Sequence, residues 1–203
     1  MCYTIKQTAN ERLLEGRFHA RVKYPPQLEQ IEKSSGFVFP LVPVITNKET
    51  DSIQLFHWGL IPQWAKDMKI RKNTLNARIE TIGEKPSFRS YTKNRCLVLI
   101  DGFYEYQWQD PKGKVKKPFL MTMPDGEPFA VGGLFSIWTD TSTGELIPTF
   151  TILTMEANEQ MAVIHNTKKR MPLILTKENE MEWLEGKLKD VKFEENLVTA
   201  EIV

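Results

Sequence analysis

The first two residues, Met1-Cys2, hold the groups with the clearest capacity for chemistry. Once an initiator methionine is removed, Cys2 carries a thiol and a free α-amine on neighbouring carbons. The α-amine titrates near pH ~8 and the thiol near ~8.5, so both are partly nucleophilic at neutral pH. Such a 1,2-aminothiol condenses with aldehydes. The alternative interpretation is that Cys2 is an incidental residue of a frayed terminus.

Glu105 is an acid in a stretch that is otherwise strand-like and aromatic, residues 101–108. Burial among aromatic side chains disfavours the charged form of a carboxylate, which suits it to shuttle protons. The alternative is an outward-facing acid on an alternating strand.

His165 precedes a basic segment and can serve as a general acid or base. Asn76, Arg78 and Glu80 alternate along the chain, so an extended backbone would place them on one face, presenting an amide and a guanidinium to a ligand. A solvated edge strand is the alternative for Arg78 and Glu80. His57 lies at a strand end and is expected to be a packed, hydrogen-bonded side chain.

The composition limits which metals, cofactors and macromolecules we expect the protein to bind. The three histidines and two cysteines lack the close spacing of metal ligands, so we expect no metal and no cofactor. The net charge is +1, yet residues 62–120 hold 13 Lys or Arg against six Asp or Glu, interleaved with aromatic residues. Such a stretch suits single-stranded nucleic acid, in which bases stack and phosphates pair with cations.

The length of 203 residues, 41% hydrophobic and 26% charged, predicts one globular domain spanning 1–203. We find no membrane-spanning run and no signal pattern at residues 3–17, and therefore expect a cytoplasmic monomer, associated with the nucleoid when bound to DNA. In a reducing compartment Cys2 and Cys96 would stay thiols.

The predicted elements alternate short helices with many strands. We expect helices that begin after Thr8, within residues 27–33, at 156–164 after a Thr154 cap, and after a Thr176 cap. Strands are expected at 54–62, 96–100, 103–108, 118–123, 129–138, 149–154 and 171–175, with an irregular or edge strand at 37–45 because of its two prolines. Turn signals between the central strands favour an antiparallel meander. The predicted fold class is α+β, with a strand-rich, curved or barrel-like antiparallel sheet flanked by short helices.

Five segments, taken in order, resemble the SRAP family of SOS-response-associated peptidases or abasic-site processing proteins. They are Met1-Cys2, residues 57–67, Asn76 to Thr81, Arg95-Cys96 with 101–105, and His165 with 170–172. The resemblance runs from Cys2 to about Thr176 and implies an SRAP-like fold.

The resemblance implies a protein that binds single-stranded DNA and joins Cys2 to the ring-opened aldehyde of an abasic site as a thiazolidine. Asn76 would orient the Cys2 amine and the sugar oxygens, Glu105 would transfer protons, and His165 would act on the deoxyribose or on reversal. If thiol addition fails, the imine can undergo β-elimination, so a lyase side activity is expected.

The resemblance also implies the DNA contacts. Arg78 and Arg89 would hold phosphates, while Pro40 and Trp64 would line the path of the strand, with Trp64 stacking on a base. The chain departs from the family in two places. Tyr3-Thr4 replaces the common Gly-Arg, and the segment between His165 and Arg170 is longer than usual.

Two other functions remain open at this point. One is a cysteine peptidase that uses Cys2, His165 and Asn76 and acts either on other peptides or only on its own Met1. The other is a reader that recognises single-stranded DNA through Trp64 and Arg78 without forming a bond.

Overall fold

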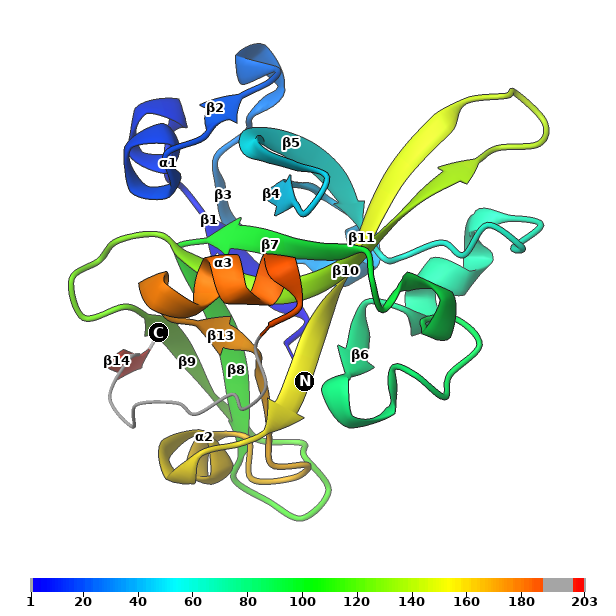
Figure 1. The fold of residues 1–203 in the computed structure, drawn as a ribbon. Coiled ribbons are helices and arrows are strands. Elements are labelled where there is room, and N and C mark those ends of the chain that lie inside the picture. Colours follow the sequence, from blue (N-terminus) through cyan, green and yellow to red (C-terminus); the bar gives the residue numbers. More distant parts are fainter. Residues whose placement is uncertain (1, 188–198, 203) are drawn as a thin grey trace.

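The computed structural model describes residues 2–187 and 199–202 (Figure 1). Its helices are α1 (Glu11–Phe18), α2 (Glu159–Ile164) and α3 (Lys177–Glu185). Its strands are β1 (Thr4–Gln7), β2 (Arg21–Val22), β3 (Ile31–Ser35), β4 (Leu41–Thr46), β5 (Glu49–Trp58), β6 (Asn76–Arg78), β7 (Arg95–Ile100), β8 (Gly102–Trp108), β9 (Lys116–Thr122), β10 (Phe129–Thr139), β11 (Leu146–Glu156), β12 (Arg170–Pro172), β13 (Ile174–Leu175) and β14 (Thr199–Ile202). The strand-rich α+β class with short helices is confirmed.

Five of these strands close into a barrel. The order β11-β10-β7-β4-β5 returns to its start because β5 also pairs with β11, at His57↔Thr149 and Trp58↔Phe150. That last pairing is parallel, as is the pairing of β6 with β11, so the sheet is mixed rather than wholly antiparallel. Closure leaves the central strands without free edges. The predicted barrel-like sheet is therefore confirmed.

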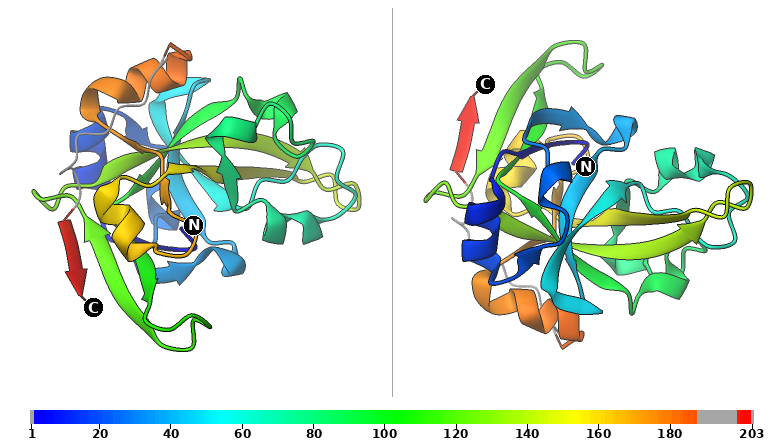
Figure 2. Two further views of the ribbon diagram at one scale, coloured as in Figure 1. Left: turned by 90° about the horizontal axis from the view of Figure 1, so that it is seen from below. Right: turned by 90° about the horizontal axis from the view of Figure 1, so that it is seen from above.

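A second sheet holds the N-terminal strand in its interior, in the order β14-β9-β8-β1-β3. Thr4 of β1 faces Tyr104 of β8 on one side and Ser35 of β3 on the other. The chain therefore starts between two partner strands, and Cys2 lies two residues before that paired region. Figure 2 shows α2 and the segment after it beside this end of the chain.

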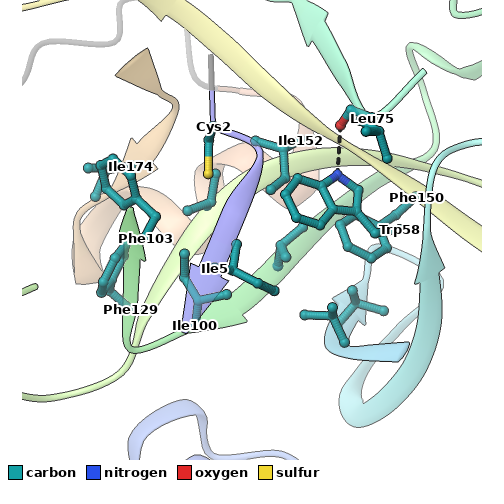
Figure 3. Close-up of a cluster of buried hydrophobic side chains, with 14 of the residues drawn as sticks. Cys2, Ile5, Trp58, Leu75, Ile100, Phe103, Phe129, Phe150, Ile152 and Ile174 are labelled. Carbon is teal, nitrogen blue, oxygen red and sulfur yellow. Dashed lines mark hydrogen bonds between the residues drawn. The ribbon is translucent and has the colours of Figure 1, made fainter. Parts of the chain in front are cut away.

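A hydrophobic cluster joins the two sheets (Figure 3). Cys2 and Ile5 of the N-terminal segment pack with Phe103 of β8 and with barrel residues such as Trp58 and Ile152. The Trp58 ring stacks on Phe150, and its indole N–H donates to the Leu75 carbonyl at 2.7 Å. A second cluster packs α1 and α3 against the barrel. The N-terminal segment is thus part of the core and not a frayed end.

The expected meander is correct only for its hairpins. The turns at 109–115 and 140–145 connect β8 with β9 and β10 with β11, as predicted. However, β8 and β9 belong to one sheet while β7 and β10 belong to the other. The hairpin of β8 and β9 therefore lies in one sheet and the hairpin of β10 and β11 in the other. Local turn signals do not encode this division, because it depends on how the two sheets pack against each other.

Two expectations near the N-terminus are wrong. The cap of α1 is Asn10, whose side chain accepts from the Leu13 N–H, because the Thr8 hydroxyl instead donates to Asp101. The helical turns expected at 27–33 are replaced by a short 3-10 helix at Pro25–Gln27 and by β3. Residues of β3 extend because they pair with β1, a contact distant in sequence.

The cap of α2 and the position of β4 also differ from expectation. Asn158 caps α2, since β11 continues through Thr154 to Glu156. β4 is an interior strand between β5 and β7, which corrects the edge-strand prediction for 37–45. Pro43 is tolerated because pairing with β7 begins only at Val44. Thr176 caps α3 as predicted.

No helix in the described part of the chain is long and apolar enough to cross a membrane.

Candidate active site around Cys2

Cys2 is fully buried, and its thiol points into the cluster between the sheets (Figure 3). The Sγ atom lies 3.8 Å from the Thr4 carbonyl, to which it donates. Burial, together with the negative charge of Glu105, raises the pKa of the Cys2 thiol to about 12. The thiol is therefore protonated at neutral pH in this state. Met1, whose removal would expose the Cys2 amine, lies outside the described residues.

Asn76 contacts the N-terminal residue directly. It lies at the start of β6, which pairs in parallel with β11 (Ile152↔Asn76), and its Nδ2 donates to the Cys2 carbonyl at 2.8 Å. The sequence led us to expect contact with the Cys2 amine, and the observed contact is with the carbonyl. The Oδ1 atom of Asn76 is buried without a hydrogen-bond partner among the described residues.

Glu105 lies on β8, the strand beside β1, and is buried. Its neighbours Tyr104 and Tyr106 point to the opposite face by strand alternation, where Lys33 lies 4.5 Å from the Tyr104 ring centroid. The Glu105 Oε1 accepts from the Tyr106 N–H at 3.1 Å. Its charge acts on both Cys2 and His165. The outward-facing alternative for Glu105 is wrong.

His165 follows the last residue of α2 and is also buried. Its Nδ1 lies 2.8 Å from the Arg170 carbonyl and 3.1 Å from the Arg170 N–H, so the Arg170 backbone can satisfy Nδ1 whether or not it carries a proton. Burial lowers the pKa of His165 below its ordinary value, and Glu105 acts in the opposite direction. Lys168 lowers this pKa further.

The side chain of Arg170 ties three segments together beside the site. It binds Glu80 through two contacts of 2.7 and 2.9 Å and donates to the Thr154 carbonyl at 2.7 Å. Glu80 lies within a short 3-10 helix, Ile79–Thr81, because the backbone is extended only through Arg78. Sequence spacing did not predict this ion pair. The sequence offered one hint of this ion pair: Glu80 and Arg170 each lie in a segment that carries the family resemblance.

Trp64 is 58% exposed on a loop that is fixed on both sides. The Gln63 N–H donates to the Tyr91 hydroxyl at 2.7 Å, and the buried Trp138 indole donates to the Ala65 carbonyl at 2.9 Å. The expected exposure of Trp64 is confirmed. We had not predicted the two anchors, which are aromatic residues with a polar tip, a type that seeks a partner when buried.

The other expected DNA contacts lie on separate segments. Arg78 is exposed at the end of β6, two residues after Asn76. Arg89 is exposed on the 3-10 helix Arg89–Tyr91, which also carries the Tyr91 anchor. Pro40 is half-buried just before β4, and its carbonyl accepts from the Trp58 N–H at 3.0 Å.

Two further residues of the motifs have structural contacts. His57 Nδ1 lies 3.1 Å from the Phe39 carbonyl, in agreement with the expected packed role. The Tyr3 ring packs against the Phe37 ring at an interplanar angle of 31°, with centroids 5.3 Å apart. Among residues 2–187 and 199–202 we find no group of three or more His, Cys, Asp or Glu side chains placed to hold a metal ion.

The geometry thus gathers a buried thiol, an amide, an acid and an imidazole at the start of the chain. A family model described as "SOS response associated peptidase (SRAP)" matches residues 1–201. The chain belongs to the SRAP family. Membership agrees with the resemblance seen in the five sequence segments.

Relatives within the SRAP family carry a more specific name. The abasic site processing protein YoqW of Bacillus subtilis is 37% identical over 187 residues, which are 92% of this chain and 76% of that protein. The abasic site processing protein HMCES of Gallus gallus is 30% identical over 203 residues, covering 86% of this chain and 56% of that protein.

A solved structure shares the whole fold. A crystal structure of a protein from Bacteroides thetaiotaomicron superposes with a TM-score of 0.89 at 34% identity, covering all of this chain and 92% of that one. The described residues of this SRAP chain therefore share the architecture of a known structure.

Proposed function

We propose that this SRAP protein processes abasic sites in single-stranded DNA by bonding Cys2 covalently to the lesion aldehyde. The observation that carries the proposal is the placement of Cys2. Its carbonyl is held by Asn76, its thiol is buried, and the charge of Glu105 acts upon it. The names of the relatives supply the substrate class, because YoqW and HMCES are called abasic site processing proteins.

The first step forms an imine. After Met1 is removed, the α-amine of Cys2 attacks the aldehyde carbon, and water leaves. Glu105 supplies and removes protons as the sugar ring opens and the carbonyl oxygen departs. The unpartnered Oδ1 of Asn76 is available to accept a hydrogen bond from the amine and so to direct its lone pair.

The second step closes a five-membered ring. The Cys2 sulfur bonds to the imine carbon, and the thiol proton is transferred to the imine nitrogen, which gives a thiazolidine. Burial and the charge of Glu105 raise the pKa of the Cys2 thiol, and such a thiol is a poor first nucleophile, which favours attack by the amine before the sulfur. Ring closure is intramolecular, and well-oriented reactions of this kind have effective molarities on the order of 10⁵ M or more.

The same thiol pKa argues against a peptidase acting on other proteins. Cysteine nucleophiles in such enzymes have a lowered pKa, whereas burial and Glu105 raise that of Cys2. Processing of Met1 alone would need only one turnover. If thiol addition is blocked, the imine is left to undergo β-elimination, so a lyase side activity belongs to the same proposal.

The test uses the protein with its mature terminus verified by intact mass. It is incubated with a single-stranded oligonucleotide containing one abasic site and then resolved on a denaturing gel. We expect a heat-stable adduct whose mass is the sum of protein and oligonucleotide less one water. A Cys2→Ala variant should lose that adduct and show strand cleavage instead. An equally stable adduct with Cys2→Ala contradicts the mechanism, and a complex that dissolves on denaturation supports a non-covalent reader.

A further inference from the structure

Five exposed lysines lie on two segments that meet beside the candidate active site. The turn between β8 and β9 carries Lys112 and Lys114, and the first residue of β9 is Lys116. The segment after α2 carries Lys168 and Lys169. We call these five residues the hairpin–loop surface. In Figure 1 the turn and the segment lie side by side at the lower edge of the molecule.

The two segments are held together by side-chain hydrogen bonds. Asn166 accepts from the Trp108 N–H at 3.1 Å and donates to the Trp108 carbonyl at 2.9 Å, as a neighbouring strand would. Gln107 donates to the Val163 carbonyl at 2.9 Å. The segment after α2 is therefore docked on the end of β8, from which the turn carrying the other lysines begins.

The hairpin–loop surface is continuous with the candidate active site. Its loop begins directly after His165, and its turn begins four residues after Glu105, which lies on β8. The Lys168 charge reaches the His165 imidazole, because it lowers the pKa of that ring. One lysine segment follows the strand that carries Glu105, and the other follows His165 directly. A single-stranded DNA whose reactive nucleotide lies at Cys2 can therefore reach these lysines within a few nucleotides.

An open cavity of about 450 Å³ lies between the two segments. It is lined by Trp108 and Pro111 together with Gln109, Asn166 and Thr167, and the Lys116 ammonium lies 5.5 Å from the Trp108 ring centroid. Asp110 also lines it, but its carboxylate is engaged by the N–H groups of Lys112 and Val115. An aromatic ring among polar groups and lysines is the kind of site that single-stranded nucleic acid occupies.

We propose that the hairpin–loop surface binds the phosphates of one single-stranded arm that flanks the reacting nucleotide. The inference rests on the proposed function for the location of that nucleotide. It gives a role to the segment between His165 and Arg170, which supplies two of the five lysines and the asparagine that docks it. The chemistry recognised is a polyanionic backbone, with the cavity taking a base.

The experiment compares wild type with a Lys112→Ala/Lys168→Ala variant, which removes one exposed lysine from each segment. The matched control is Lys23→Ala/Lys48→Ala, two exposed lysines near the turn between β4 and β5. Rates of adduct formation are measured from 50 to 200 mM NaCl with subsaturating oligonucleotides that extend on only one side of the abasic site. For single strands, each lost phosphate contact lowers the salt slope by about 0.7, so we expect a reduction of about 1.4 in the variant.

The reduction should occur with one of the two one-armed oligonucleotides and not with the other. A variant whose slope matches wild type and control with both oligonucleotides overturns the inference. Failure of the proposed function looks different, because wild type itself then forms no Cys2-dependent adduct. In that case fluorescence anisotropy with an undamaged single strand still tests the surface, and an unchanged salt slope in the variant overturns it. Thermal melting of both variants verifies their folding.

Discussion

Asn76 shows how one side chain can fix the reactive end of the chain. Its amide contacts the Cys2 carbonyl at 2.8 Å, while its carbonyl oxygen is buried and unpartnered among the described residues. The residue therefore sets the direction of the Cys2 backbone and leaves an acceptor for the amine. The contact between Asn76 and Cys2 does not follow from sequence spacing, because 74 residues separate Asn76 from Cys2.

We predict that Asn76→Asp lowers the rate of adduct formation at least tenfold. A carboxylate of the same size cannot donate to the Cys2 carbonyl, and a lost hydrogen bond costs about 1 kcal/mol before the repulsion between the two oxygens is added. The rate is measured with abasic single-stranded DNA on denaturing gels.

A matched control exists in the same chain. Asn47 also donates through Nδ2 to a carbonyl, that of Lys93 at 3.0 Å, and also has a buried, unpartnered Oδ1 among the described residues. Asn47→Asp should destabilise the fold by a similar amount without slowing the reaction. Equal loss of rate in both variants would show that Asn76 acts only on stability.

At the scale of elements, strands followed from local composition while partners did not. The aromatic and β-branched stretches from β7 to β11 were predicted within a few residues, because those side chains suit a pleated, buried surface. β3 was mistaken for helix, since its sequence Ile31–Ser35 has little apolar character and it extends only by pairing with β1. Thr8 and Asn10 are both good caps, and only the distant Asp101 decides between them.

For the candidate site, too, the sequence indicated the residues but not the contacts between them. The sequence alone indicated a reactive Cys2, an unusual acid at Glu105, an acid or base at His165 and an amide at Asn76, and the family resemblance implied that these four act together. The contacts that hold them, such as Arg170 with Glu80, join segments 90 residues apart. Such contacts depend on how β6, β11 and β12 pair, which the periodicity of each strand cannot specify.

The docking of the segment after α2 on β8 yields a prediction at this scale. Asn166→Ala removes both hydrogen bonds to Trp108. We expect the free energy of unfolding to fall by about 1 kcal/mol, because the contacts are exposed, and the rate of adduct formation to fall several-fold, because His165 precedes the segment. Urea unfolding and gel-based rates measure the two effects.

Thr141→Ala is the control, since Thr141 is an exposed residue of the turn between β10 and β11, outside the docked segment and outside the cavity beside it. It should leave both the stability and the rate near their wild-type values. A loss of stability in Asn166→Ala without any change in rate would mean that the docking does not position His165.

For the whole molecule, packing two sheets around the N-terminal segment buries both thiols. Cys2 lies between the sheets and Cys96 lies on barrel strand β7, each with no exposed surface. Burial raises the pKa of both thiols above the ordinary value. The folded protein therefore holds these thiol protons more tightly than the unfolded chain does. As a result, its free energy of unfolding decreases at alkaline pH.

The sign of this linkage is fixed. Below the unfolded thiol pKa of about 8.5 both states are protonated, and the stability is fully present. As pH rises further the unfolded chain releases thiol protons while the folded chain keeps them, so the free energy of unfolding falls. Each buried thiol contributes a slope of up to about 1.4 kcal/mol per pH unit between roughly pH 9 and 11.

We predict that Cys96→Ala reduces this alkaline slope by about 1 kcal/mol per pH unit, although the variant is less stable than wild type at pH 7. The measurement is urea unfolding at pH 7, 9, 10 and 11, in which the other titrating groups contribute alike to both proteins and cancel in the difference. Cys96 is preferred to Cys2 for this test because it lies in the middle of the barrel and far from the terminus in sequence. Parallel pH curves for the two proteins would show that the Cys96 thiol ionises as readily in the fold as in the unfolded chain, which its complete burial opposes.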